Sequence, residues 1–145
     1  KHGCIASDIV NVFDAFLEET FLALAQGGTL VLPASEEERI SASGIRRLIS
    51  THDVTIISTV PAILDLLTPD DVKGLNLIIS GGDVLRQATV NILMGSSDSL
   101  RIINTYGPTE TTIVATYAEC IKGVTPSIGK PFPGVGVALV NQIVT

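Results

Sequence analysis

Three short apolar runs, separated by segments with helical spacing, constrain the fold of this chain most strongly. The runs are "VTIIST" at 54–59, "LNLIIS" at 75–80 and "LRIIN" at 100–104. Each is apolar and β-branched without polar alternation, a pattern typical of strands that are buried on both faces. Between them, "PAILDLL" at 61–67 and "VLRQATVNILMG" at 84–95 indicate helices. Strands that alternate with helices predict a three-layer α/β fold, with a mostly parallel sheet flanked by helices.

The flanking segments extend this pattern. A helix is expected in "FDAFLEETFLALAQGG" at 13–28, which ends in a pair of glycines, a normal helix stop. Its apolar residues form one stripe, made of Phe13, Leu17, Phe21 and Leu24. A second helix is expected in "GIRRLISTH" at 44–52, capped by Ser41 or Ser43, after the acidic "SEEER" at 35–39 as a solvated approach. Further strands are predicted in "TLVLP" at 29–33, "TIVATYAE" at 112–119 and "VGVALVN" at 135–141.

Composition limits the classes of function. No apolar run approaches the ~20 residues of a membrane span, so an integral membrane protein is not expected. The net charge is −6 and the nine Lys and Arg residues are scattered, which argues against binding to nucleic acid. Cys4 and Cys120 are far apart without metal-ligand spacing, and they indicate reduced thiols in a cytoplasmic protein.

The chain has the size of one domain, but its composition is apolar for a free-standing soluble domain. Of its 145 residues 46% are hydrophobic and 17% charged, and the mean hydropathy is +0.47. Either the sheet is covered on both faces or some surface packs against further protein. Because the chain opens on Lys1 without a methionine and ends in the apolar "VALVNQIVT", we expect a single unit, residues 1–145, taken from a longer protein.

Three predicted strands end in residues that a simple turn does not need. They are Ser58, the segment from Ser80 to Asp83, and the segment from Asn104 to Glu110. Carboxyl ends of parallel strands lie at one edge of a sheet, where ligands bind, so we expect these segments to form a site.

The segment "NTYGPTE" has the groups that a nucleotide with its metal requires. Gly107 allows the backbone to approach a ligand closely, and Tyr106 offers a flat face for stacking. Thr109 supplies a hydroxyl for a phosphate oxygen, and Glu110 supplies a carboxylate oxygen for Mg²⁺.

The longer segment "NTYGPTETT" at 104–112 resembles the core signature of adenylate-forming enzymes, in the form typical of amino-acid adenylation domains of nonribosomal peptide synthetases. The resemblance covers essentially the whole chain. Segments similar to the family occur in its order, namely "VFDAF", "LALAQGGTLVLP", "TIISTVPAIL", "LIISGGDVL" and "SIGKPFPG". It implies that the chain is the central, flavodoxin-like subdomain of an adenylation domain, the one that determines specificity.

The resemblance also implies roles in binding ATP and Mg²⁺. Tyr106 is expected to stack on adenine, with Asn104 and the Gly81–Gly82 backbone around the base. The catalytic pair would be Thr109 at the α-phosphate and Glu110 at the Mg²⁺ ion. Backbone carbonyls near Gly107 and Ile113 would help to hold the substrate. The implied partners are an amino acid, ATP, the remaining subdomains, and a carrier domain with phosphopantetheine in the same chain.

The amino-acid pocket implied by the resemblance contains Asp14, Ala15, Glu18, Ser58, Ile79, Gly81, Thr105, Ile113 and Val114. Asp14 would pair with the α-ammonium group. Glu18 is four residues further along the same predicted helix, so its side chain shares a face with Asp14. Because Ala15, Ser58 and Gly81 are small and a buried unpaired carboxylate is costly, the pocket predicts lysine as the substrate, with ornithine second. The alternative is that Glu18 and Glu19 are first-turn acids, favoured by the helix dipole, with Asp14 as the N-cap.

Departures from the family pattern leave other interpretations open. The family usually has "FDxS" where this chain has "FDAF", so Phe16 stands in place of the serine. The chain also lacks a phosphate loop, a hinge and a small C-terminal subdomain with its catalytic lysine. Because the family's catalytic lysine lies in that missing subdomain, Lys130 is expected to be structural. Arg46 and Arg47 are expected to be surface charges. The 145-residue chain is expected to be inactive alone. A fragment of an acyl- or aryl-CoA ligase is the second hypothesis, although Asp14 argues against it. A non-enzymatic flavodoxin-like binding domain is the third.

Overall fold

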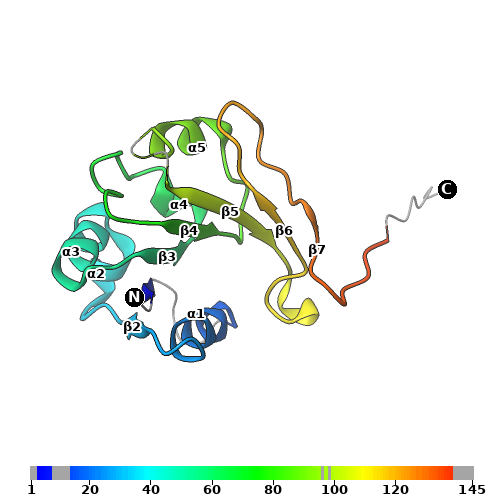
Figure 1. Ribbon diagram of the computed structural model, residues 1–145, viewed down its shortest axis with the longest axis horizontal. Helices are drawn as coiled ribbons and strands as arrows, with labels where there is room; N and C mark the ends of the chain where they lie inside the picture. The colour runs from blue at the N-terminus through cyan, green and yellow to red at the C-terminus, as the bar shows by residue number, and fades with distance from the viewer. Residues whose placement is uncertain (1–2, 8–13, 96, 98, 139–145) are drawn as a thin grey trace.

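The computed structural model describes residues 3–7, 14–95, 97 and 99–138. In this part of the chain seven strands form one sheet, in the order β2-β1-β3-β4-β5-β6-β7 (Figure 1). The strands are β1 (Cys4–Ser7), β2 (Thr29–Val31), β3 (Ile56–Thr59), β4 (Leu77–Ser80), β5 (Arg101–Tyr106), β6 (Thr116–Glu119) and β7 (Lys130–Pro131). Strands β1 to β5 are parallel, whereas β6 and β7 are antiparallel. The predicted, mostly parallel sheet is confirmed, and β2-β1-β3-β4-β5 has the order of flavodoxin-like folds.

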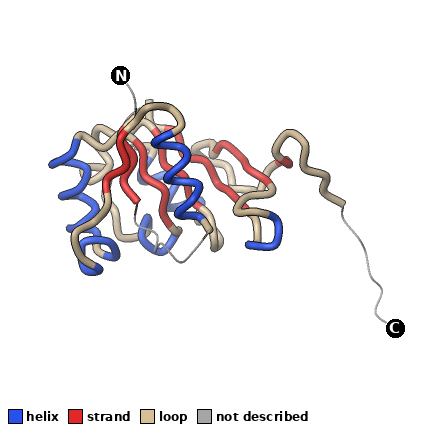
Figure 2. Tube along the Cα trace, turned by 90° about the horizontal axis from the view of Figure 1, so that it is seen from below, coloured by secondary structure: helices blue, strands red, loops and turns tan. Residues whose placement is uncertain are grey.

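Helices cover both faces of this sheet. They are α1 (Ala15–Leu24), α2 (Glu36–Ile40), α3 (Ala42–His52), α4 (Pro61–Leu64), α5 (Gln87–Leu93) and the 3₁₀ turn η1 (Thr109–Thr111). The main core joins one row of the sheet, Ala6, Ile57, Ile78 and Ile102, to buried residues of α3, α4 and α5. Helix α1 lies on the opposite face, below the sheet in Figure 1 and in front of it in Figure 2. None of the helices in the described residues is long and apolar enough to span a membrane.

The strands differ from the predictions at four places, one of which is the two-residue strand β7, which the sequence did not reveal. The sequence did not reveal β1, because "CIAS" is short and lacks a pattern. The strand predicted at 112–119 starts only at Thr116, since Thr112 and Ile113 have left-handed φ angles of 63° and 70° that cannot continue a strand. In the segment predicted at 135–141, residues 135–138 are not a strand, and 139–141 lie outside the described residues.

The acidic segment 35–39 is structured, which corrects its interpretation as a solvated approach. Ser35 caps α2 by accepting a bond from the Glu38 amide at 3.2 Å. The Glu38 carboxylate accepts bonds from the Ala34 amide at 2.7 Å and the Arg47 side chain at 2.8 Å. The residue is buried, and these bonds lower the pKa of Glu38, the Ala34 amide most strongly. Of the two predicted caps for α3, Ser41 is confirmed, because its side chain accepts from the Gly44 amide.

Candidate functional site

The predicted pocket residues on the strands share one face of the sheet. Side chains alternate along a strand, and Ile57, Ile78 and Ile102 face the core formed with α3 to α5. Ser58 and Ile79 are register partners and therefore face the other side, toward the layer of α1. Thr105 also points to that side, since it lies three positions after Ile102. All three are buried.

Helix α1 supplies the facing side of the site. It carries Ala15 and Glu18, and Asp14 precedes it directly. Helix α1 packs against β1 and β2. The sheet and α1 thus place on one side of the molecule most of the residues that the resemblance assigns to the amino-acid pocket.

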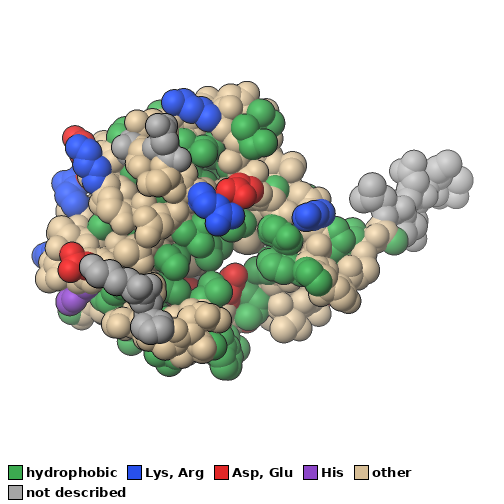
Figure 3. Space-filling model, in the orientation of Figure 1, with side chains coloured by type: hydrophobic (Ala, Val, Ile, Leu, Met, Phe, Trp, Pro, Cys, Tyr) green, Lys and Arg blue, Asp and Glu red, His purple; other side chains and the backbone are tan. Residues whose placement is uncertain are grey.

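A groove of about 560 Å³ separates α1 from the segment after η1. It is lined by Leu17, Glu18, Phe21, Leu22, Gln26, Thr112, Ile113, Val114 and Phe132. Figure 3 shows the molecule hollowed on this side, with hydrophobic side chains around the opening. Of the predicted set, Glu18, Ile113 and Val114 line the groove. Asp14, Ala15, Ser58, Ile79, Gly81 and Thr105 do not line it.

The two acidic side chains at the start of α1 influence one another. Burial raises the pKa of Glu18, and the nearby charge of Asp14 raises it further. Asp14 occupies the N-cap position of α1 and Glu18 lies in the first turn, as the alternative interpretation expects. The Asp14 side chain makes no capping bond, however, and its φ and ψ angles of −61° and −31° are helical. Its buried Oδ2 atom has no hydrogen-bond partner among the described residues. A buried carboxylate oxygen without a partner favours a cationic ligand.

The loop after β5 is closed tightly on itself. A methyl group on Gly107 would lie 2.6 Å from the Ile113 carbonyl oxygen, so no larger residue fits there. The Ala115 amide donates to the Tyr106 carbonyl at 2.8 Å. Tyr106 is 52% exposed at the end of β5, and Thr109 and Glu110 are exposed on η1. The ring, hydroxyl and carboxylate assigned to the nucleotide therefore project from one turn.

Asn104 and the glycine pair lie at the neighbouring strand ends. The Asn104 amide nitrogen donates to the Ser127 carbonyl at 2.8 Å, whereas its buried Oδ1 atom has no partner among the described residues. A methyl on Gly81 would lie 2.5 Å from Thr105 Oγ1, and Gly82 has a φ of +85°. The amide and glycine residues that the resemblance assigns to the adenine base therefore lie at neighbouring strand ends.

The metal assignment rests on Glu110. The described residues contain no group of three or more His, Cys, Asp or Glu side chains that could hold a metal ion. Mg²⁺ bound with a nucleotide needs only one or two carboxylates, because phosphates and water complete its shell. One exposed carboxylate, four residues after Tyr106 on η1, fits that role.

Sequence reasoning missed part of the groove. Leu17 and Phe21 belong to the apolar stripe that indicated a helix, yet they are 51% and 66% exposed. Phe132 lies within the segment "SIGKPFPG", and the resemblance implies no role for its side chain. The signal available was the excess of apolar residues in the chain, which cannot show which of them face a groove.

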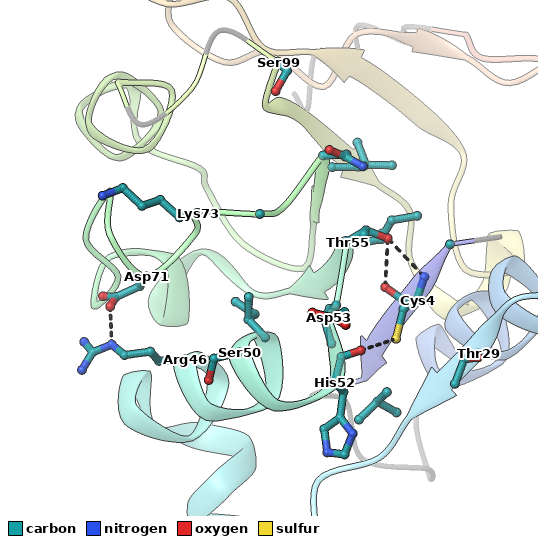
Figure 4. Close-up of a pocket in the computed structure, with 18 of the residues that line it drawn as sticks. Cys4, Thr29, Arg46, Ser50, His52, Asp53, Thr55, Asp71, Lys73 and Ser99 are labelled. Atoms are coloured by element: carbon teal, nitrogen blue, oxygen red, sulfur yellow. Dashed lines mark hydrogen bonds and ion pairs between the residues drawn. The ribbon is translucent and has the colours of Figure 1, made fainter. Parts of the chain in front are cut away.

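A larger hollow of about 1200 Å³ lies at the opposite edge, where β3, β4 and β5 begin (Figure 4). Its cations are paired: Arg46 with Asp71, Lys73 with Asp70 at 2.7 Å, and Arg101 with Glu119 at 2.7 Å. The Cys4 thiol donates to the His52 carbonyl at 3.4 Å, and burial raises its pKa. None of the predicted site residues lies here.

Comparisons with known proteins agree with the fold. The AMP-binding enzyme family matches residues 8–143. Tyrocidine synthase 3 of Brevibacillus parabrevis is 33% identical over 135 residues, which are 90% of this chain and 2% of that protein. The adenylation domain AlmE of Vibrio cholerae, solved with glycyl-adenosine-5'-phosphate, superposes with a TM-score of 0.78 at 25% identity, over 90% of this chain and 26% of that one.

A second solved structure is PA1221, a nonribosomal peptide synthetase protein containing adenylation and PCP domains. It superposes with a TM-score of 0.73 at 26% identity, over 83% of this chain and 21% of that one. The chain thus spans between 2% and 26% of the length of these three proteins. The family match extends over most of the chain and includes the strand-end loops described above, and the chain belongs to the AMP-binding enzyme family, as a segment of an adenylation domain.

Proposed function

We propose that this chain is the flavodoxin-like, specificity-determining part of an adenylation domain that activates an amino acid as aminoacyl-AMP for nonribosomal peptide synthesis. The observation that carries the proposal is the shared face of the sheet, where α1, the strand ends and the loop after β5 meet. The rest of the adenylation domain and a carrier domain with phosphopantetheine would act with it in the same protein.

ATP would supply the adenylyl group that is transferred to the amino-acid carboxylate, with pyrophosphate as the leaving group. Mg²⁺ would neutralise charge on the phosphates. In this chain Tyr106 would stack on the adenine, and the free Oδ1 atom of Asn104 would accept a bond from its edge. Thr109 would donate to the α-phosphate and Glu110 would hold Mg²⁺. Since these residues bind and orient, their contribution is positioning and charge stabilisation.

The substrate proposed is lysine, with ornithine second. Two acidic groups one helical turn apart suit a molecule with two ammonium groups: Asp14 for the α-ammonium and Glu18 for the side chain. Support comes from the unpaired Oδ2 atom of Asp14 and from the position of Glu18 in a groove lined mainly by apolar residues. A cation beside Glu18 would offset the burial and the repulsion that raise its pKa.

The test is amino-acid-dependent ATP–pyrophosphate exchange by the whole adenylation domain, over a panel that includes lysine, ornithine and neutral amino acids. Lysine should give the highest kcat/KM, and Glu18→Gln should remove this preference. Glu37→Gln, an exposed acid of α2, is the matched control. Undiminished preference for lysine in Glu18→Gln would exclude the acidic pocket, and absence of exchange with every amino acid would exclude adenylation.

A further inference from the structure

Phe132 forms part of the groove opposite α1. It follows β7 and lines the same groove as Glu18 of α1 and Ile113 of the loop after β5. No other aromatic side chain on that side of the groove lines it among the described residues. The ring is 37% exposed, so it is available to a molecule in the groove.

The position of this ring is fixed by its surroundings. The Phe132 amide donates to the Ala115 carbonyl at 3.1 Å, next to the groove residue Val114. Its ring lies 4.4 Å from the Tyr117 ring, centroid to centroid, at an angle of 38°. Prolines on both sides, Pro131 and Pro133, restrict the backbone. A ring held in this way loses little conformational entropy when it contacts a ligand.

Aromatic faces attract cations, and this aromatic pair already has one beside it. Lys130 Nζ lies 5.9 Å from the centroid of Tyr117, the ring that packs on Phe132. The groove side of Phe132 has a carboxylate, Glu18, in the same lining. A carboxylate and an aromatic face in one groove form a site for an ammonium group on an aliphatic chain.

We propose that Phe132 is a specificity-determining residue of the amino-acid site, whose ring contacts the cationic end of the substrate side chain while Glu18 neutralises its charge. This inference rests on the proposed function, because it assumes that the groove receives a cationic amino acid. The class of ligand is an α-amino acid with a flexible aliphatic side chain that ends in an ammonium group.

The experiment uses the whole adenylation domain and the variants Phe132→Leu and Phe132→Tyr. The readouts are kcat/KM for lysine in pyrophosphate exchange and the inhibition constant of norleucine, which has a side chain of similar length without the charge. Phe132→Leu should lower kcat/KM for lysine by about 2- to 30-fold, the range of cation–π energies. It should change the norleucine constant less than about twofold, and Phe132→Tyr should retain the wild-type values.

Ile128→Ala, an exposed apolar residue of the same segment outside the groove lining, is the control for general effects on folding. Equal losses for lysine and norleucine in Phe132→Leu would overturn the proposal, since the ring would then act only as an apolar wall. Unchanged values for both would overturn it as well. Failure of the wild-type domain to activate lysine or ornithine would refute the proposed substrate, and absence of exchange with every amino acid would refute the proposed function; both are seen before any variant is made.

Discussion

Gly107 and Ile113 are in such close contact that a methyl group on the glycine would lie 2.6 Å from the Ile113 carbonyl oxygen. The same methyl would lie 2.7 Å from the Ala115 amide nitrogen. Both atoms are backbone, so neither can move without shifting the loop. This contact joins the turn that carries Tyr106 to the segment that forms one wall of the groove, and it links the predicted nucleotide site to the predicted amino-acid site.

Gly107→Ala should therefore disturb both sites at once. We expect the free energy of unfolding to fall by about 1–3 kcal/mol, as for other overpacking substitutions, and the KM values for ATP and for the amino acid to rise together. Gly136→Ala is the control, because a methyl group there meets no atom within 4 Å, and it should change stability by less than about 0.5 kcal/mol. Denaturant unfolding and pyrophosphate exchange measure the two effects. A stable, fully active Gly107→Ala variant would contradict the predicted contact.

Gly81 and Thr105 form a second contact that leaves no space. A methyl on Gly81 would lie 2.5 Å from Thr105 Oγ1, which donates to the Ser80 carbonyl at 3.2 Å. Gly81→Ala should destabilise the protein, and Thr105→Ala should partly rescue it because the clashing oxygen is removed. A double-mutant cycle by denaturant unfolding checks this, with an expected coupling of about 0.5–3 kcal/mol. Strictly additive effects would show that the two residues do not touch.

The sequence predicted those parts of the fold that follow from hydrophobic pattern. Strands β3 and β4 lie within predicted apolar runs, and β5 begins in one and continues two residues beyond it, because burial on both faces needs continuous apolar residues. The loop after β5 was identified from its composition. The pattern could not show the left-handed backbone at Thr112 and Ile113, since both residues are β-branched and favour strands.

Contacts between residues far apart in the chain also could not be predicted from the sequence. Glu38 appeared as one of three consecutive acids, and only the fold shows that the Arg47 side chain reaches it. The pocket residues were assigned by resemblance, whereas the sheet register explains why Ser58 and Ile79 share a face. Phe132 lies near Glu18 only through the packing of β7 beside β6, which no local pattern encodes.

Asp71 should make stability depend on pH in the acidic range. Its carboxylate accepts bonds from Arg46 and from the amide and hydroxyl of Thr68, both at 2.8 Å, and Arg46 is the main cause that lowers its pKa from 3.8 to about 2. A lowered folded pKa stabilises the protein above pH 3.8, and this stabilisation is lost as the pH falls toward 2. The difference corresponds to about 2 kcal/mol.

Asp71→Asn should remove this contribution, so that the free energies of unfolding of the variant and the wild type differ at pH 7 and converge toward pH 2. Asp70→Asn is the matched control, since Asp70 is 83% exposed and its pair with Lys73 lies at the surface. Urea unfolding between pH 2 and pH 7 checks the prediction. A pH-independent difference between Asp71→Asn and the wild type would mean that the Asp71 pKa is not lowered.

Ionised Glu18 should lower the free energy of unfolding, although it helps to bind the amino-acid substrate. Burial and the charge of Asp14 raise the pKa of Glu18, so folding favours its protonated form and the stabilisation is lost as the pH rises through the folded pKa. At pH 7 and without amino acid, Glu18→Gln should therefore unfold at a higher denaturant concentration than the wild type, although it activates lysine less well. Glu37→Gln should do neither. A destabilised Glu18→Gln variant would contradict the predicted repulsion.

Tyr106 provides a test of the nucleotide half of the site alone. It is exposed at the end of β5, and its side chain is not part of the groove lining. Tyr106→Ala should raise the KM for ATP by about tenfold, because stacking of a base on an aromatic ring contributes about 1–3 kcal/mol, and Tyr106→Phe should retain the wild-type value. The KM for the amino acid should stay within about twofold in both variants. Initial rates of pyrophosphate exchange with varied ATP and varied amino acid separate the two constants, and equal KM values for ATP in Tyr106→Ala and the wild type would remove this ring from the nucleotide site.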